Sequence, residues 1–359
     1  MPVRGAPPLC GHHHEHHLGE VVEAGLARRW GIPFGALVKL RRSISGVPSV
    51  VCRVWPKEEE ILAAVNQSVP NTPRHLGEWG DYAVHTYAPG RPVSALRPPS
   101  KTMPSHHCMR QLMAFFRRLA RVDTASLPSP PVDWPEDGDS TGFLRRLVRL
   151  TEDTVHQRNR AEFGELFDKL GVPADAMEDF GRRIPPFTKR PFSLLHTDIH
   201  RDNLVMQPDG TLFLLDWELA MVGDPLHELA THLVRMKYPS DRARKSVIAQ
   251  WKVAMSEVSS AATTDFEGDL QWYLDYEHAQ SIYPDIIRAA LHFEADPREA
   301  AAVAAVRQVR KALVAARWPL RIGEVQESTE IRRHLFDWAS GRGGRGRRGS
   351  VDRWLWPAG

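Results

Sequence analysis

The feature that most constrains this chain is a polar segment, residues 196–203, which reads His-Thr-Asp-Ile-His-Arg-Asp-Asn and follows a short apolar run. Two more apolar runs, separated by Pro-Asp-Gly, come next and predict a β-hairpin. Asp216 stands at the end of that hairpin. The pattern therefore predicts a loop and a hairpin that bring Asp198, Asn203 and Asp216 together.

These three side chains are of the kinds that phosphoryl transfer requires. Carboxylate and amide oxygens are ligands for a hard divalent cation, and a carboxylate can also orient a hydroxyl group beside a triphosphate. A loop of this kind needs none of them merely to fold. We therefore predict a phosphotransferase, with a nucleotide site in the sequence before this segment and an acceptor site after it.

Length and composition are those of a globular chain of two lobes or domains. The chain has 359 residues, of which 42% are hydrophobic and 25% are charged. The formal net charge is only +3, so no strong field draws the whole molecule towards nucleic acid. We expect no nucleic-acid partner. The composition does not indicate which oligomeric state the protein has.

The cysteines and the apolar runs indicate the compartment. Three cysteines, Cys10, Cys52 and Cys108, are scattered without the paired spacing of a zinc site or a disulfide framework. The amino terminus lacks an apolar core of signal-peptide length, and no apolar run is long enough to cross a bilayer. We expect a cytoplasmic protein without a membrane partner.

Five histidines lie within residues 12–17. They are compatible with a purification tag, a metal-binding tract, a solvated arm, or a loop between the first two strands of a nucleotide-binding lobe. The run is interrupted by Glu15 and continues directly into folded-looking sequence, which argues against a tag. We favour the loop interpretation.

Two apolar runs after residue 36 predict strands of that lobe, at residues 37–40 and 49–55. Arg53 stands in the middle of the second run, where a cation can project onto phosphates. A helix is expected at residues 57–65, and Glu58 in its first turn could hold that cation in place. The alternative is that Arg53 faces outward and Glu58 belongs to a solvated helix start.

A further strand is predicted at residues 81–87, closed by Ala-Pro-Gly. It can pass behind an adenine ring, so the backbone groups of Thr86 and Ala88 are candidate nucleotide contacts. We expect residues 1–90 to form the nucleotide-binding lobe and the proline-rich residues 91–105 to form a linker.

Residues 106–340 are expected to be a mostly helical lobe, because helical apolar stripes recur there without alternating strands. This pattern excludes a doubly wound sheet. Residues 341–359 are rich in Gly and Arg and cannot bury a core, so we expect a disordered basic tail. Such a tail can bind RNA, but a solvated tail fits the small net charge better.

The pattern His-x-Asp-x4-Asn followed by Asp-Trp-Glu resembles the aminoglycoside phosphotransferase and choline kinase-like family, the small-molecule branch of the protein-kinase fold. The resemblance extends over about residues 50–236. Thr197 replaces the usual glycine, and Arg201-Asp202 replace the usual Pro-Gly. The resemblance implies an α+β, protein-kinase-like fold of two lobes, the first small and β-rich and the second large and mostly helical.

The resemblance also implies ATP and Mg²⁺ as cofactors and assigns roles to individual residues. Asp198 matches the catalytic aspartate, and His200 is expected near the γ-phosphate. Asn203 and Asp216 match the magnesium ligands, while Arg53 stands in for the phosphate-binding lysine.

The sequence indicates the acceptor site less clearly than the nucleotide site. The segment after residue 265 carries carboxylates beside aromatic rings, which would suit a cationic or sugar-like acceptor, and Glu218, Asp269 and Tyr276 are the candidate substrate residues. A solvated acidic helix face is the more common explanation. The leading hypothesis is an antibiotic acceptor of the aminoglycoside, nucleoside or peptide type. The alternatives are a primary metabolite, such as choline, a sugar or a homoserine-like alcohol, and a nucleotide-binding protein without transfer activity.

Overall fold

The computed structural model describes residues 3–9, 14–44, 46, 48, 50–96, 103–296 and 298–342. The chain divides into two compact units. Unit 1 comprises residues 1–47, 53–138 and 189–266, and unit 2 comprises residues 48–52, 139–188 and 267–359. Of the predicted basic tail, residues 343–359 lie outside the described residues.

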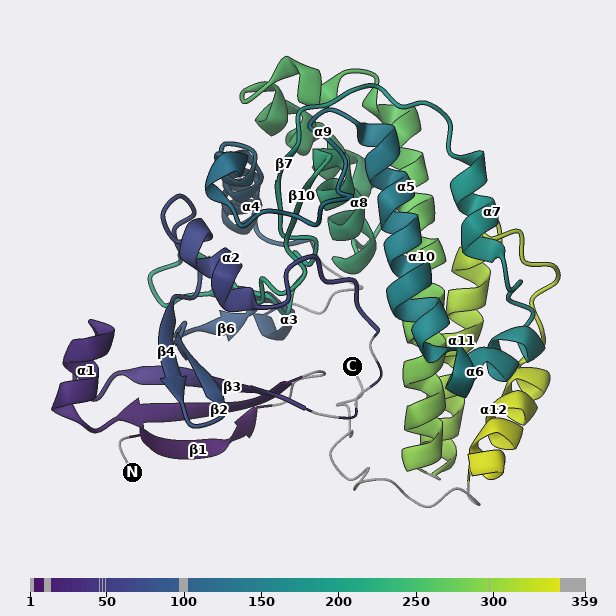
Figure 1. The fold of residues 1–359 in the computed structure, drawn as a ribbon, viewed down its shortest axis with the longest axis horizontal. Coiled ribbons are helices and arrows are strands. Elements are labelled where there is room, and N and C mark those ends of the chain that lie inside the picture. The colour runs from purple at the N-terminus through teal and green to yellow at the C-terminus, as the bar shows by residue number, and fades with distance from the viewer. Residues whose placement is uncertain are drawn as a thin grey trace. The chain divides into compact units, whose positions relative to one another are not determined.

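Unit 1 begins with a five-stranded antiparallel sheet in the order β1-β2-β3-β5-β4, drawn in purple and blue in Figure 1. Its strands are β1 (Val3–Leu9), β2 (His14–Val21), β3 (Leu37–Ser43), β4 (His75–Trp79) and β5 (Tyr82–Thr86). Val38 and Leu40 of β3 pack with Trp30 of helix α1 (Ala24–Trp30) in a buried cluster. Because side chains alternate across a strand, Lys39 and Arg41 lie on the opposite face.

The strand predicted at residues 49–55 was wrong. Residues 50–57 form bends and irregular backbone, so Arg53 is not on a strand. The apolar pattern there has another cause: Trp55 is buried, and its indole N–H donates to the carbonyl of Pro128 at 3.2 Å. The helix predicted next is confirmed as α2 (Glu58–Val65).

The histidine cluster is also not the predicted loop where the structure describes it. His14, His16 and His17 belong to β2 and pair in register with β3. His12 and His13 lie outside the described residues.

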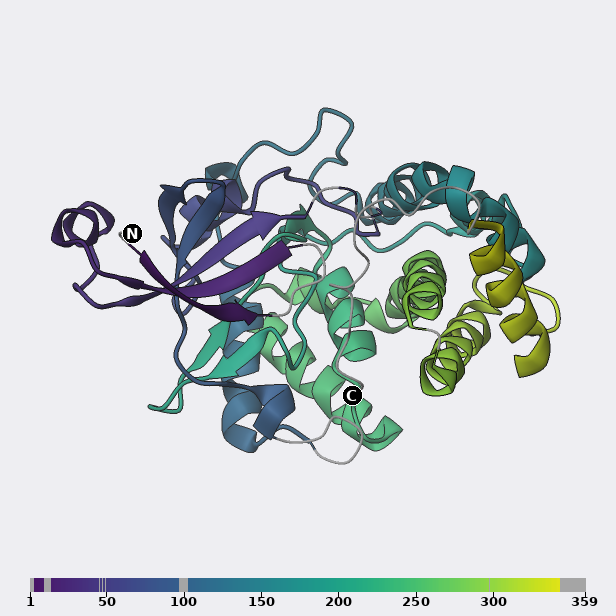
Figure 2. The ribbon, with the colours of Figure 1, turned by 90° about the horizontal axis from the view of Figure 1, so that it is seen from below.

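The rest of unit 1 consists of helices and two small sheets, which Figure 2 shows from below. One sheet pairs β7 (Ser193–Leu195) with β10 (Met221–Gly223), and the other has the order β6-β8-β9. The predicted hairpin is confirmed as β8 and β9, and the segment 196–203 is the loop between β7 and β8. The remaining strands, helices and 3-10 turns of unit 1 are β6 (Arg91–Pro92), α3 (Val93–Leu96), α4 (His106–Leu119), η1 (Thr124–Ser126), β8 (Leu204–Met206), β9 (Leu212–Leu214), α8 (Pro225–Arg235), α9 (Asp241–Ser256) and η3 (Ser260–Thr263).

The secondary structure elements of unit 2 are helices in the part of the chain that the structure describes. It contains α5 (Ser140–Thr151), the π-helical turn η2 (Glu152–Gln157), α6 (Arg158–Lys169), α7 (Ala176–Arg183), α10 (Phe266–Ala295), α11 (Glu299–Ala316) and α12 (Ser328–Arg342). Tyr273 of α10 donates its hydroxyl hydrogen to the carbonyl of Ser140 at 3.3 Å, which ties α10 to α5. In the described part of the chain, none of the helices has the length and apolarity needed to cross a membrane.

Candidate functional site

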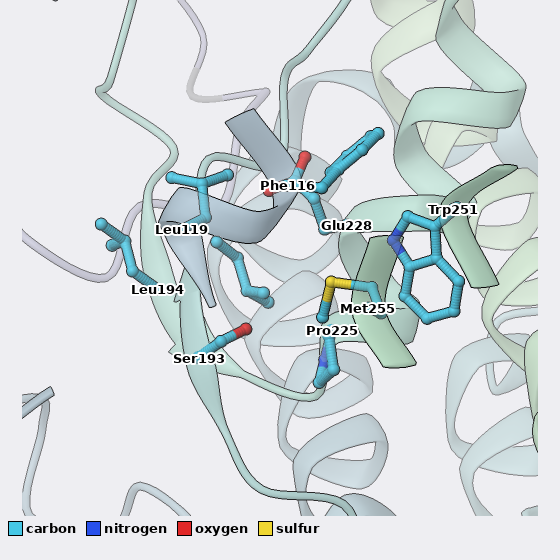
Figure 3. Close-up of a pocket in the computed structure, with 9 residues that line it drawn as sticks. Phe116, Leu119, Ser193, Leu194, Pro225, Glu228, Trp251 and Met255 are labelled. Carbon is cyan, nitrogen blue, oxygen red and sulfur yellow. The ribbon is translucent and has the colours of Figure 1, made fainter. Parts of the chain in front are cut away.

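A buried carboxylate fixes the backbone of the polar loop. Glu228 of α8 accepts hydrogen bonds from the backbone N–H groups of His196 and Thr197, the second at 3.0 Å. Its side chain lies among the apolar groups shown in Figure 3, including Phe116 and Trp251. Burial raises the pKa of Glu228 to about 7, although the two N–H donors act in the opposite direction. Glu228 therefore attaches the loop to the core of unit 1.

His196 anchors the same loop. Its ring is fully buried, contacts the indole of Trp217 edge-on, and bonds through Nε2 to the carbonyl of Leu215 at 2.9 Å. Burial lowers the pKa of His196 to about 4. The imidazole is therefore neutral at pH 7, which suits a structural role.

Asp198 is held as a carboxylate. Arg235 of α8 donates to its Oδ1 at 2.5 Å, the Nε2 of His200 lies 3.4 Å from the same oxygen, and Asn203 donates to Oδ2 at 2.8 Å. Burial opposes ionisation, but Arg235 and His200 outweigh it and lower the pKa of Asp198. This carboxylate can accept a hydrogen bond from a hydroxyl group without being a strong base.

His200 is a cation at neutral pH. Burial disfavours its charge, but hydrogen bonds to Asp198 and Asp202 outweigh burial and raise the pKa of His200 to about 9. The ring is partly exposed. It can therefore stabilise negative charge that develops next to Asp198.

Asn203 and Asp216 are brought together by the hairpin. Leu204 pairs with Leu214, and the N–H of Leu215 donates to the carbonyl of Asn203 at 2.9 Å, so Asp216 follows directly. The amide NH₂ of Asn203 donates to Asp198, which leaves its amide oxygen available as an acceptor or metal ligand.

These two residues fit Mg²⁺. The ion takes one or two protein oxygens and fills its remaining positions with water and phosphate oxygens. The described residues contain no cluster of three or more His, Cys, Asp or Glu side chains for an all-protein cage.

The helix glutamate predicted to hold a phosphate-binding cation pairs with Arg41, not with Arg53. Arg41 of β3 forms ion pairs with Glu58 and Glu218. The second oxygen of Glu58 accepts the backbone N–H of Trp217 at 2.6 Å. Glu58 therefore connects β3 and α2 to the residue after Asp216.

Lys39 lies two residues before Arg41 on the same face of β3. Burial lowers the pKa of Lys39, and its nearest opposite charges are Asp216 and Glu218. In the described part of the chain its ammonium group has no hydrogen-bond or ion-pair partner. Lys39 is thus a half-buried amine on which the charges of Asp216 and Glu218 act, available to a phosphate group.

Arg53 and Glu218 form an ion pair at 2.8 Å. Glu218, predicted as a substrate residue, therefore faces cations of the first lobe. Burial raises the pKa of Glu218, and the nearby Asp216 adds to this effect.

Thr86 and Ala88, predicted as nucleotide contacts, both belong to unit 1. The N–H of Thr86, at the end of β5, donates to the carbonyl of Arg74 at 2.9 Å, and Ala88 packs against Val205 in a small apolar cluster.

Asp269 and Tyr276, predicted as substrate residues, are in unit 2. Asp269 accepts the N–H of Thr188 at 3.1 Å, and the buried Tyr276 hydroxyl bonds to Thr151 at 2.8 Å. These contacts favour a structural role for Tyr276.

Four residues of the site were not predicted from the sequence: Lys39, Arg41, Glu228 and Arg235. The alternation of Lys39 and Arg41 in an apolar run was a usable signal for one polar strand face. Glu228 and Arg235 carried no local signal, because their partners lie more than 30 positions earlier.

Solved structures show the fold. A candidate aminoglycoside phosphotransferase from Ralstonia eutropha aligns over 95% of this chain and 93% of its own, with a TM-score of 0.53 and 14% identity. The aminoglycoside phosphotransferase APH(4)-Ia aligns over 90% of this chain and 94% of its own, with a TM-score of 0.50 and 14% identity. The predicted α+β, protein-kinase-like fold is confirmed.

Sequence comparison identifies the family. No curated protein matches this chain. The family model described as "Phosphotransferase enzyme family" matches residues 54–262, more than half of the 359 residues. The matched region includes Glu58, the polar loop and Asp216. This chain belongs to the phosphotransferase enzyme family.

Proposed function

We propose that this enzyme transfers the γ-phosphate of ATP to a hydroxyl group of a small molecule, with Mg²⁺ as cofactor. One observation carries the proposal. Asp198 is an ionised carboxylate bonded at 2.8 Å to the amide of Asn203, and the hairpin places Asp216 beside Asn203. This is a hydroxyl-orienting group next to two oxygen ligands for a cation.

Asp198 acts on the acceptor. Its carboxylate accepts the hydrogen bond of the acceptor hydroxyl and aims the hydroxyl oxygen at the γ-phosphorus. The bond from that oxygen to phosphorus forms while the bond from phosphorus to the bridging oxygen of ADP breaks, and the hydroxyl proton passes to Asp198. The low basicity of Asp198 is no obstacle, because the transition state is loose and the proton moves late.

The nucleotide phosphates are held by charge. Asn203 and Asp216 would hold Mg²⁺, which supplies charge neutralisation on the phosphate oxygens when bound. Lys39 would bind a phosphate oxygen directly. Arg41, fixed by Glu58, keeps β3 and α2 in position. We assign the phosphate-binding role to Lys39 in place of Arg53, because Lys39 is on the strand face beside Asp216.

We further propose that the acceptor is an antibiotic with a free hydroxyl group, of the aminoglycoside, nucleoside or peptide type, which phosphorylation inactivates. The support is the overall likeness in fold to two solved structures described as aminoglycoside phosphotransferases.

A transfer screen tests both proposals. The purified protein is incubated with ATP and Mg²⁺ and one compound from a panel of antibiotics and metabolic alcohols, and products are read by mass spectrometry for an added phosphate. A phosphorylated antibiotic, together with growth protection of a sensitive host, is the expected result. Phosphorylation of metabolites alone would refute the antibiotic acceptor but keep the phosphotransferase. ATP binding without transfer to any compound would refute both.

A further inference from the structure

Unit 2 contains a groove that the proposed chemistry does not use. It lies between α11 and α12 and has a volume of about 690 Å³, which is within the usual range for ligand pockets. None of its lining residues belongs to unit 1. They are Ala302, Val303, Val306, Arg307, Arg310, Lys311, Val314, Ser328, Thr329 and Arg332.

The charged side chains that line the groove are all positive. Four lining residues are cations and none is a carboxylate. Arg332 is paired with Glu299 through two contacts of 2.6 Å. Within the described residues, no hydrogen bond or ion pair is found for Arg307, Arg310 or Lys311. Three neighbouring cations on one helix thus repel one another, and a bound anion would reduce this repulsion.

The same groove has an apolar surface. Val306 of α11 is nearly buried, at 7% exposed, whereas Val303 and Val314 are 45% and 51% exposed. The adjoining side of α11 contributes to the core of unit 2, where Val309 and Leu313 are fully buried. The exposed valines extend over about 16 Å of helix, at 1.5 Å per residue. A polar ligand would leave this strip in water.

We propose that this groove binds a single-chain amphiphile with an anionic head, either a carboxylate or a phosphate, and an aliphatic tail. Arg307, Arg310 and Lys311 neutralise the head, and the valines cover the tail. The like charge of the groove repels a polycation, so a cationic acceptor is not its ligand. The proposal goes beyond the proposed function and does not depend on it.

Calorimetric titration of the full chain with dodecyl phosphate, below its micelle concentration, tests this site. We expect saturable binding with one site per chain. Arg310→Glu should weaken it about tenfold or more, because one attraction becomes a repulsion. The matched control is Arg333→Glu, an exposed arginine of α12 outside the groove lining, which should leave affinity within about twofold. Circular dichroism verifies that both variants are folded.

Three further titrants distinguish the head, the tail and a membrane as the source of binding. Inorganic phosphate and dodecyltrimethylammonium should each bind much more weakly than dodecyl phosphate. The proposal is overturned if either binds equally well, if Arg333→Glu weakens binding as much as Arg310→Glu, or if dodecyl phosphate does not bind. Binding only to vesicles of phosphatidylglycerol would also overturn it, because the surface would then recognise a membrane.

Discussion

At the scale of single residues, the site is distinguished by its backbone. Thr197 and Asp216 both have positive φ, at 60° and 63°. Aspartate tolerates this region, but for a β-branched residue it is strained. The strain at Thr197 is offset by a hydrogen bond from its hydroxyl to the carbonyl of Leu219 at 2.7 Å. The conformation also explains why glycine is usual at this position in the family that the sequence resembles.

Two substitutions of Thr197 separate the strain from the hydrogen bond. Thr197→Val keeps the branched shape but leaves the carbonyl of Leu219 without its donor, and should lower the free energy of unfolding by about 1–3 kcal/mol. Thr197→Gly loses the same bond but removes the backbone strain, so its net change should be within about 1 kcal/mol. Urea denaturation measures both. Equal destabilisation by the two variants would show that the backbone is not strained.

At the scale of secondary structure elements, helix α8 positions the polar loop, residues 196–203. Glu228 accepts two loop N–H groups with one carboxylate, and its Oε1 has no partner within the described residues. The adjoining cavity, in Figure 3, is about 10 Å³, which is close to the room that one water molecule needs. Under the proposed function, we expect this carboxylate to act on catalysis through the loop and not by contact with a substrate.

Variants of Glu228 test this positioning role. Glu228→Leu leaves two buried N–H groups unpaired and should lower both the free energy of unfolding and kcat, because Asp198 shares that loop. Glu228→Gln keeps an acceptor oxygen and should retain kcat within about tenfold. Stability is followed by urea denaturation and kcat by ADP release. If the leucine variant is folded and fully active, Glu228 does not position the loop.

Strand β3 is the second positioning element, since it carries Arg41, which pairs with Glu58 and Glu218, and Lys39, on which the charge of Asp216 acts. Lys39→Met should raise the KM for ATP about tenfold or more, because it removes a charge beside the phosphates. Arg53→Met is the matched control and should change the KM less, since Arg53 lies in an irregular segment and pairs with Glu218. The reverse order of effects would restore Arg53 as the phosphate-binding residue.

At the scale of the whole molecule, local patterns predicted local structure well. The polar loop, the hairpin and helix α2 were predictable because turn residues, a helix dipole and apolar spacing act over a few positions. The long-range contacts of the site residues were not predictable in this way. Arg41 meets Glu218 across 177 positions, and Trp55 is buried by packing rather than by a sheet. The strand predicted around Arg53 was wrong, whereas the phosphate-binding role of Arg53 stays a prediction, which the comparison of Lys39→Met with Arg53→Met tests.

Buried neutral histidines give the molecule a pH-dependent stability. Burial lowers the pKa of His85 and His227 to about 3 and that of His196 and His232 to about 4. The unfolded value is about 6.5, so the unfolded chain binds more protons below that pH. Their contribution is complete above pH 6.5 and is lost as the pH falls towards 4 for His196 and His232 and towards 3 for His85 and His227. The raised pKa of Glu228 acts oppositely between about pH 7 and 4.5, and the raised pKa of His200 acts oppositely between about pH 9 and 6.5. Below pH 6.5 the four buried histidines outweigh Glu228.

We therefore expect the free energy of unfolding to fall between pH 7 and pH 5. Each histidine contributes up to about 1.4 kcal/mol per pH unit. Urea denaturation at a series of pH values measures the slope, and His85→Leu should reduce it. A stability that is constant or rises on acidification over this range would contradict the buried neutral state.

The central claim is that Asp198 orients the acceptor hydroxyl, and the most direct measurement compares Asp198→Asn with Asp202→Asn. Both carboxylates lie 3.4 Å from His200, but Asp202 is largely exposed. With the acceptor found in the screen, Asp198→Asn should lower kcat about 100-fold or more, while Asp202→Asn should stay within about threefold. A folded Asp198→Asn variant with near-normal kcat would contradict the account.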